Sequence, residues 1–208
     1  MIEVEMTVMH RKLAHGETLT LGSGHYAIGV LHGRLSVAGR PVANGQGGYA
    51  RSGEVVLSDD QEPADFLLFS VGQLAGDQSP QLSARIRLQA GKCLLRLDQV
   101  TFPPGAIAYR HVHKGAGIRY LTRGRLDVRT DHGAQKITPG GAWFEDTNSP
   151  VMATSSPDEE TAFVRAMLVQ PELLGRPTIT YLDEEDADKP RLQTNTRFFE
   201  TAVEFLDQ

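Results

Sequence analysis

The sequence has no cluster of basic residues. Its formal net charge is −5 and its isoelectric point is about 5.8. Nucleic acids and anionic membrane surfaces are bound through concentrated positive charge, so this balance argues against both partners. No apolar run is long enough to span a bilayer, and the first residues, MIEVEMTVMHRKL, carry acids where a secretory signal would have its apolar core. We therefore expect a cytoplasmic protein that binds neither nucleic acid nor membrane.

Cysteine and helical periodicity are also scarce. Cys93 is the only cysteine, so the chain cannot form an internal disulfide. It lies in the apolar run CLLRL, where we expect it to be a buried small hydrophobic side chain. Residues 171–175 are compatible with one helical turn, and ETAVEFL near the C-terminus is ambiguous between strand and helix.

What the chain does contain is short strand-like runs. Glycine occurs 21 times and proline 11 times, and they separate runs rich in Val, Ile, Leu and Thr. Such runs bounded by turn residues are typical of β-strands. Their regular spacing predicts an all-β sandwich or barrel.

The two halves of the chain resemble each other. The run GRLSV at residues 33–37 recurs as GRLDV at residues 124–128. Two further pairs follow in the same order: 47–51 with 141–145, and 62–69 with 159–166. Three ordered matches with the same strand and turn character predict an internal duplication.

The duplication suggests a division of the chain. Residues 72–81, GQLAGDQSPQ, have the composition of a linker. We expect an N-terminal domain over residues 1–78, a second domain over 79–171, and a tail over 172–208 that packs on both. The acidic run DEEDAD in this tail is expected to be a solvated loop.

His111 and His113 form the only His-x-His sequence in the chain. Alternation along a strand would place both imidazoles on one face. Two neutral imidazoles side by side are the beginning of a metal site, but they bind weakly without a third ligand. The alternative is a pair of histidines that bond only to backbone or water.

The segment around these histidines resembles the first sequence motif of the cupins. In PGAIAYRHVHKGAGIRYLTRG, residues 104–124, five residues separate Gly105 from His-x-His, and Gly124 closes the motif. Residues 141–156 resemble the second motif more weakly. The resemblance implies a bicupin, in which two cupin-type antiparallel β-barrels of the jelly-roll (double-stranded β-helix) kind follow one another in one chain.

Two of the family's usual ligand positions are lost in this sequence. The resemblance places the first-motif glutamate on Gly117 and the second-motif histidine on Met152. In the N-terminal half the His-x-His positions fall on Thr20 and Gly22, and the glutamate position on Tyr26. The N-terminal barrel is therefore expected to be degenerate and structural.

Glu145 is the best candidate for a third ligand. Period two places it on the same inward face as Trp143, and two histidines with one carboxylate would suit Fe(II) or Mn(II). Arg119 should also face inward, where it would hold an anionic group of a substrate or pair with Glu145. The second option competes with metal binding.

Four further side chains complete the predicted pocket region. Tyr109 precedes His111 by two residues and would be a donor to a ligand or part of the barrel wall. Trp143 is expected to line the pocket, and Met152 to make one side of it apolar. Arg165 is a second candidate for an inward cation, but it lies in AFVRAML, which is apolar at both odd and even positions, so its side is left open and a solvent-facing arginine is the default expectation.

The leading functional hypothesis is a metal-binding bicupin, and the resemblance implies an enzyme of the dioxygenase type. One divalent ion (Fe, Mn, Ni or Zn) would bind His111, His113 and Glu145, while Tyr109 and Arg119 would act on the substrate. The alternatives are a metal-free ligand-binding or sensing cupin, and a metal-free sugar-isomerase-like enzyme with a histidine base. In each case the partner is a small molecule, for which an anionic group is one option. A homodimer through exposed strands is left open.

Overall fold

The computed structural model describes residues 1–59, 62–72 and 79–206. Regular structure in these residues is almost entirely β-strand, and two 3₁₀ turns, η1 (Pro171–Leu173) and η2 (Glu184–Asp186), lie near the C-terminus. The all-β prediction is confirmed. In the described part of the chain, no helix reaches the length and apolarity that crossing a membrane requires.

The first barrel is built from the N-terminal strands. They are β1 (Ile2–Leu13), β2 (Thr18–Thr20), β3 (His25–His32), β4 (Arg34–Val37), β5 (Arg40–Ala43), β6 (Gly47–Arg51), β7 (Val55–Ser58) and β8 (Ala64–Gly72). These strands form two antiparallel sheets, in the orders β6-β3-β8-β1 and β2-β7-β4-β5. Strand β9 (Leu82–Leu88) extends the first sheet by pairing with β1.

The second barrel repeats this arrangement. Its strands are β10 (Gly91–Phe102), β11 (Ile107–His113), β12 (Gly115–Arg123), β13 (Leu126–Thr130), β14 (Gly133–Ile137), β15 (Ala142–Glu145), β16 (Val151–Ser155) and β17 (Thr161–Val169). The sheet orders are β15-β12-β17-β10 and β14-β13-β16-β11. Each strand occupies the place of its counterpart in the first barrel, so the two cupin-type barrels and the internal duplication are confirmed.

Two glycines show why the repeated run GRL matters. Gly33 and Gly124 begin it in the two halves, and both have a left-handed backbone, with φ of 76° and 73°. A Cβ atom on Gly33 would lie 2.5 Å from the carbonyl oxygen of Pro63, and one on Gly124 would lie 2.7 Å from that of Glu160. The same tight turn, packed against the same place in each barrel, therefore requires glycine twice.

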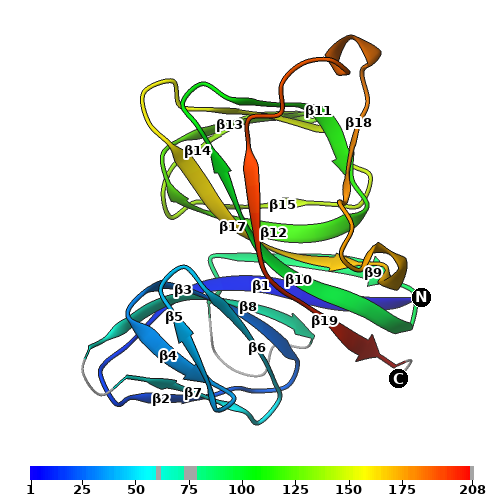
Figure 1. The fold of residues 1–208 in the computed structure, drawn as a ribbon. Helices are drawn as coiled ribbons and strands as arrows, with labels where there is room; N and C mark the ends of the chain where they lie inside the picture. The colour runs from blue at the N-terminus through cyan, green and yellow to red at the C-terminus, as the bar shows by residue number, and fades with distance from the viewer. Residues whose placement is uncertain (60–61, 73–78, 207–208) are drawn as a thin grey trace.

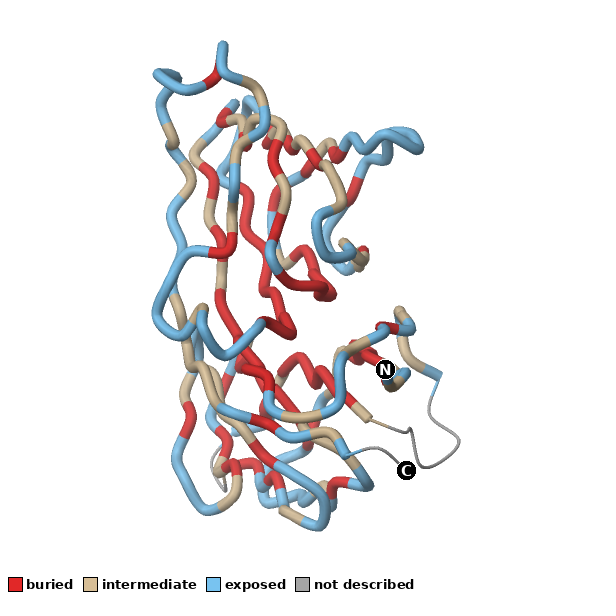
Figure 2. The backbone as a smooth tube through the Cα atoms, turned by 90° about the vertical axis from the view of Figure 1, so that its right-hand side faces the viewer, coloured by how far each residue is buried: buried red, intermediate tan, exposed pale blue. Residues whose placement is uncertain are grey.

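The barrels pack through their larger sheets. Met6 and Phe69 from the first barrel share one apolar cluster with Leu97 and Ala166 from the second. Figure 1 shows the barrels one above the other, and Figure 2 shows buried backbone where they meet. Cys93 belongs to the same cluster, as expected, and burial raises the pKa of its thiol to about 12.

The tail lies along the second barrel and reaches the first. Strand β18 (Ile179–Tyr181) pairs with β11, and β19 (Thr194–Phe205) pairs with β10. The segment ETAVEFL is therefore a strand. The run DEEDAD is not a fully solvated loop, because Asp186 is 6% exposed and pairs with Lys189. Most of the expected linker, residues 73–78, and with it the expected domain boundary, lies outside the described residues.

Candidate functional site

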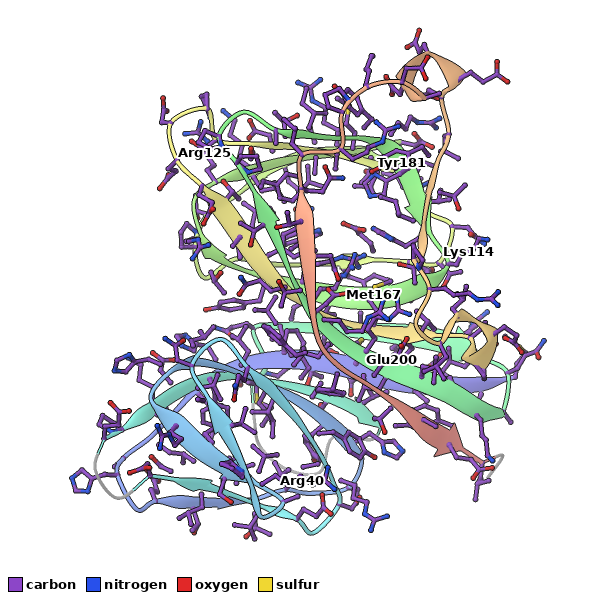
Figure 3. The ribbon with its side chains drawn as sticks, viewed as in Figure 1. Arg40, Lys114, Arg125, Met167, Tyr181 and Glu200 are labelled. Carbon is purple, nitrogen blue, oxygen red and sulfur yellow. The ribbon has the colours of Figure 1, made fainter. Side chains whose placement is uncertain are left out.

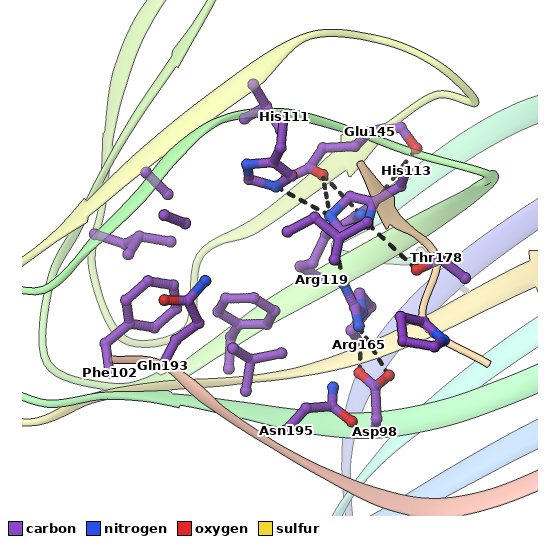
Figure 4. Close-up of a pocket in the computed structure, with 18 of the residues that line it drawn as sticks. Asp98, Phe102, His111, His113, Arg119, Glu145, Arg165, Thr178, Gln193 and Asn195 are labelled. Carbon is purple, nitrogen blue, oxygen red and sulfur yellow. Dashed lines mark hydrogen bonds and ion pairs between the residues drawn. The ribbon is translucent and has the colours of Figure 1, made fainter. Parts of the chain in front are cut away.

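The second barrel contains a cavity of about 390 Å³ beside β11 (Figure 4). One part of its wall is apolar, formed by Val100, Phe102, Leu126, Val151, Ala153 and Phe163. The remainder is polar and charged, and it includes both histidines of the His-x-His sequence. The cavity thus offers an apolar region and a strongly polar region to one ligand.

His111 and His113 lie in contact at the polar end. They are 5% and 6% exposed, and their Nε2 atoms are 3.2 Å apart. His111 Nδ1 is 2.6 Å from the carbonyl oxygen of Tyr109, which can only accept, so His111 carries its proton on Nδ1. The unprotonated Nε2 of His111 then faces His113 Nε2, which also lies 3.5 Å from Arg165 Nη1. His113 Nδ1 lies 3.3 Å from the Thr178 hydroxyl, which can donate or accept.

Burial keeps the two rings uncharged. It lowers the pKa of His111 and lowers the pKa of His113 well below its usual value. The guanidinium groups of Arg165 and Arg119 lower the pKa of His113 further, whereas at His111 the Tyr109 carbonyl and the Glu145 carboxylate partly oppose the effect of burial on the pKa. A charged imidazolium is therefore disfavoured by loss of solvent and by neighbouring positive charge together.

Glu145 pairs with Arg119 at the floor of the cavity. Its Oε2 is 2.7 Å from Arg119 Nη2, and its Oε1 accepts a hydrogen bond from Trp143 Nε1 at 2.9 Å. The orientation of the Arg119 contact does not meet the criteria of a directional hydrogen bond, so its attraction is mainly Coulombic. Of the two roles open to Glu145, the structure shows pairing with Arg119.

Arg119 is the most deeply buried charge of this group. It has no exposed surface, and its Nη1 donates to the Gly117 carbonyl at 2.5 Å. Burial lowers its pKa to about 10, although the neighbouring Glu145 carboxylate acts in the opposite direction. The arginine remains charged at neutral pH and depends on that carboxylate for compensation.

Arg165 also faces the cavity, so the expectation that it points to solvent is wrong. It is 7% exposed and donates from Nε and Nη2 to both oxygens of Asp98, at 2.9 and 2.8 Å. Strand β17, which carries Arg165, is mostly apolar at both its odd-numbered and its even-numbered positions because both of its faces are covered. Val164 and Ala166 pack in the cluster between the barrels, and Phe163 and Arg165 line the cavity.

The structure does not bring Tyr109 into the cavity. The pairing of β11 with β16 shifts register between Ala108 and His111, so Ala108 and His111 line the cavity and Tyr109 does not. Instead the Tyr109 ring lies 5.0 Å from Lys189 Nζ and 5.2 Å from Arg191 Cζ. A β-bulge breaks the simple alternation on which the prediction rested.

Met152 likewise lies outside the cavity lining. Its neighbours Val151 and Ala153 line it, so the Met152 side chain alternates to the other face of β16. Trp143, by contrast, is 4% exposed and lines the cavity as expected. The apolar wall exists, but Val151 and Ala153 supply it on this strand.

The tail contributes cavity residues that the sequence reasoning missed. Residues 191, 193, 195 and 197 all line the cavity, and they are Arg191, Gln193, Asn195 and Arg197. In β19 this face lies along β10, with Asn195 opposite Val100 and Arg197 opposite Asp98. Figure 4 shows Asn195 and Gln193 on this side of the cavity. The run RLQTNTR is polar at every position but one, so no alternation in the sequence indicated which of its residues face inward.

Positive charge exceeds negative charge in the cavity wall. The charged residues that line it are Arg96, Arg119, Arg165, Arg191, Arg197, Asp98 and Glu145. Behind the wall, Glu200 of β19, labelled in Figure 3, contacts both Arg96 and Arg197. Among the described residues, Arg191 forms no ion pair with a carboxylate; its guanidinium lies 3.7 Å from the Tyr181 ring centroid. The wall therefore carries an uncompensated positive charge.

The side chains do not fit a three-ligand metal site. No group of three His, Cys, Asp or Glu in the described chain has the geometry to hold a metal ion. Glu145 Oε2 lies 3.7 Å from His113 Nε2 but only 2.7 Å from Arg119 Nη2, and its Oε1 accepts from Trp143. Arg165 Nη1 lies 3.5 Å from His113 Nε2, where its charge would repel a cation. At Gly117, where the resemblance places a glutamate, a Cβ atom would lie 2.3 Å from the Ala166 carbonyl oxygen.

The fold and its cavity define a two-barrel protein of the cupin type. Among solved structures the chain is similar to AerE from Microcystis aeruginosa, with 11% identity, a TM-score of 0.62 and coverage of 79% of this chain and 88% of that one. It is also similar to oxalate decarboxylase from Bacillus subtilis at pH 4.6, with 15% identity, a TM-score of 0.61 and coverage of 89% and 72%. No family model matches the sequence, and no curated protein matches it. At these identities the likeness shows the fold alone.

Proposed function

We propose that the second barrel binds a small organic anion and does so without a metal ion. The observation that carries this proposal is the excess of arginine over carboxylate in the wall of the cavity. A buried positive charge without a partner is costly, and an anionic ligand would compensate it. The cavity volume of about 390 Å³ is within the range of small-molecule sites.

The apolar part of the wall suggests the rest of the ligand. Phe102 and Phe163 lie with their ring centroids 6.1 Å apart, and Trp143 packs edge-on to Phe163 at 5.1 Å. These rings would contact an apolar or aromatic body, while the polar end takes the acid group. A carboxylic acid with an apolar body matches both regions.

The two fixed ion pairs support binding without metal. Asp98 holds Arg165, and Glu145 holds Arg119, so both arginines stand beside the histidines in fixed positions. Together with burial, the two arginines keep the neighbouring histidine rings neutral, and they make the potential around these rings positive. A positive potential favours an anion over a divalent cation. The dioxygenase-type hypothesis needs a metal and gains no support from this arrangement.

Metal binding remains a second candidate because of one observation. The 3.2 Å separation of the two Nε2 atoms would allow one ion to lie about 2.1 Å from both. It would require Glu145 to leave Arg119, or water to complete the coordination.

A thermal-shift comparison tests the proposal. Protein treated with EDTA is heated with small carboxylic acids and with the matching neutral amides. We expect the acids to raise the melting temperature and the amides to have little effect, with no change when divalent metal is added back. Equal effects of acid and amide, or stabilisation only after metal is restored, would contradict the proposal.

A pair of variants locates the binding. Ala153→Phe places a large ring in the cavity, since Ala153 lines it, and should abolish the acid-dependent shift. Ala134→Phe makes the same change on exposed β14 and should retain it. Loss of the shift in both variants, or in neither, would place the binding elsewhere.

A further inference from the structure

We propose that the ligand is a hydroxy acid, with its carboxylate on Arg191 and its hydroxyl on Gln193. This rests on the proposed function and adds to it the class of acid and the recognising residues. Both residues precede β19 in the tail, outside the strands that the two barrels share. The tail would thus determine ligand specificity for the second barrel.

Arg191 presents a free donor to the cavity. Its Nη2 donates to the Asp186 carbonyl at 2.7 Å, and its guanidinium lies 3.7 Å from the Tyr181 ring centroid. These contacts fix the plane of the group. Its Nη1 is buried without a hydrogen-bond partner among the described residues. A fixed guanidinium with one unused donor and no carboxylate partner is suited to bind a carboxylate oxygen.

Gln193 presents a free acceptor beside it. Its Nε2 donates to the Tyr181 hydroxyl at 3.0 Å, which sets the orientation of the amide. Its Oε1 is buried, and no described group donates to it. Buried acceptors are rarely left without a donor, so a ligand hydroxyl or ammonium group would satisfy it.

The two groups are close enough to bind neighbouring groups of one ligand. They are two residues apart on one face of the chain, and both contact Tyr181. Gln193 and Phe102 line the same cavity, so one ligand can reach both the polar end and the apolar wall. An ammonium group would be repelled by Arg191 and Arg197, which favours a hydroxyl as the donor.

Calorimetric titration with three probes tests the inference. Phenyllactate, phenylpropanoate and phenylalanine share one aromatic body and differ in the group next to the carboxylate. With EDTA-treated wild type we expect phenyllactate to bind about three- to tenfold more tightly than phenylpropanoate, because one neutral hydrogen bond is gained. Phenylalanine should bind more weakly than phenyllactate.

Two variants assign the contacts. Gln193→Leu should bring the affinities for phenyllactate and phenylpropanoate together, and Arg191→Leu should weaken both about tenfold or more. The controls Gln135→Leu and Arg129→Leu alter exposed residues of β14 and β13 and should change neither affinity.

The outcomes separate this inference from the proposed function. Equal binding of phenyllactate and phenylpropanoate to wild type, or a preference for phenylalanine, would overturn the hydroxy-acid inference and leave anion binding intact. A Gln193→Leu protein that keeps the preference would overturn the role of Gln193. If no carboxylic acid binds, the proposed function fails as well.

Discussion

Replacing Glu145 by glutamine should destabilise the protein strongly. Within the described part of the chain, Glu145 is the only carboxylate that pairs with Arg119, whose side chain has no exposed surface, and the change removes its charge. Glutamine keeps an oxygen that can still accept from Trp143 Nε1, but its NH2 group then faces the Arg119 donor, so the change removes both the charge and the acceptor beside Arg119. Arg119 is then left buried and uncompensated.

The expected size follows from this burial. Breaking a buried ion pair by removing one partner costs about 3–5 kcal/mol, because the remaining charge has lost its solvent and its counter-charge. The exposed pair of Arg123 and Glu160 provides a matched control, with side chains 54% and 52% exposed. There the change Glu160→Gln should cost at most about 1 kcal/mol.

Urea unfolding at neutral pH, followed by tryptophan fluorescence, gives both free energies of unfolding. The double variant Arg119→Met, Glu145→Gln removes both charges and should regain much of the loss seen in Glu145→Gln. A Glu145→Gln protein as stable as the Glu160→Gln control would refute the assignment of Glu145 as the counter-ion of Arg119.

Three further predictions follow from the same contacts. Gly117→Ala should lower the free energy of unfolding by more than Gly29→Ala, because a Cβ atom at Gly117 would lie 2.3 Å from the Ala166 carbonyl oxygen, while the nearest atom to one at Gly29 is Val164 Cγ1 at 3.4 Å; the same urea assay measures it. Because the folded-state pKa of His111 and His113 is lowered, the unfolded state takes up protons first as the pH decreases. The contribution of these rings to the free energy of unfolding is therefore complete above about pH 6.5 and is lost below it, by at most about 1.4 kcal/mol per pH unit for each ring. The variant His111→Gln, His113→Gln should show a smaller loss between about pH 7.5 and pH 5.5 than wild type, and an equal loss would contradict the assignment. Asp98→Asn should destabilise the protein more than Asp131→Asn, because Asp98 holds buried Arg165 in two hydrogen bonds and Asp131 pairs with a half-exposed Arg110.

The fold was accessible from the sequence because its constraints are local and repeated. Turn glycines such as Gly33 and Gly124 must recur wherever a tight turn packs against a strand, and strand runs between them keep their order. The shared orientation of His111 and His113 could be predicted because it is also local: alternation along a strand places residues i and i+2 on the same face.

The composition of the site was less accessible because it depends on register and on distant segments. The bulge in β11 that excludes Tyr109 leaves no mark in the local pattern. Arg165 faces inward because the first barrel covers the other face of its strand, which no local window reveals. The residues of the tail enter the cavity only because β19 pairs with β10, about a hundred residues earlier in the chain.

Crystals grown with phenyllactate and a manganese salt would test the central claim most directly. The account predicts ligand density in the second barrel, with its carboxylate at Arg191, and no anomalous peak between the two histidines. A metal peak about 2.1 Å from Nε2 of both His111 and His113, with Glu145 turned away from Arg119, would contradict it.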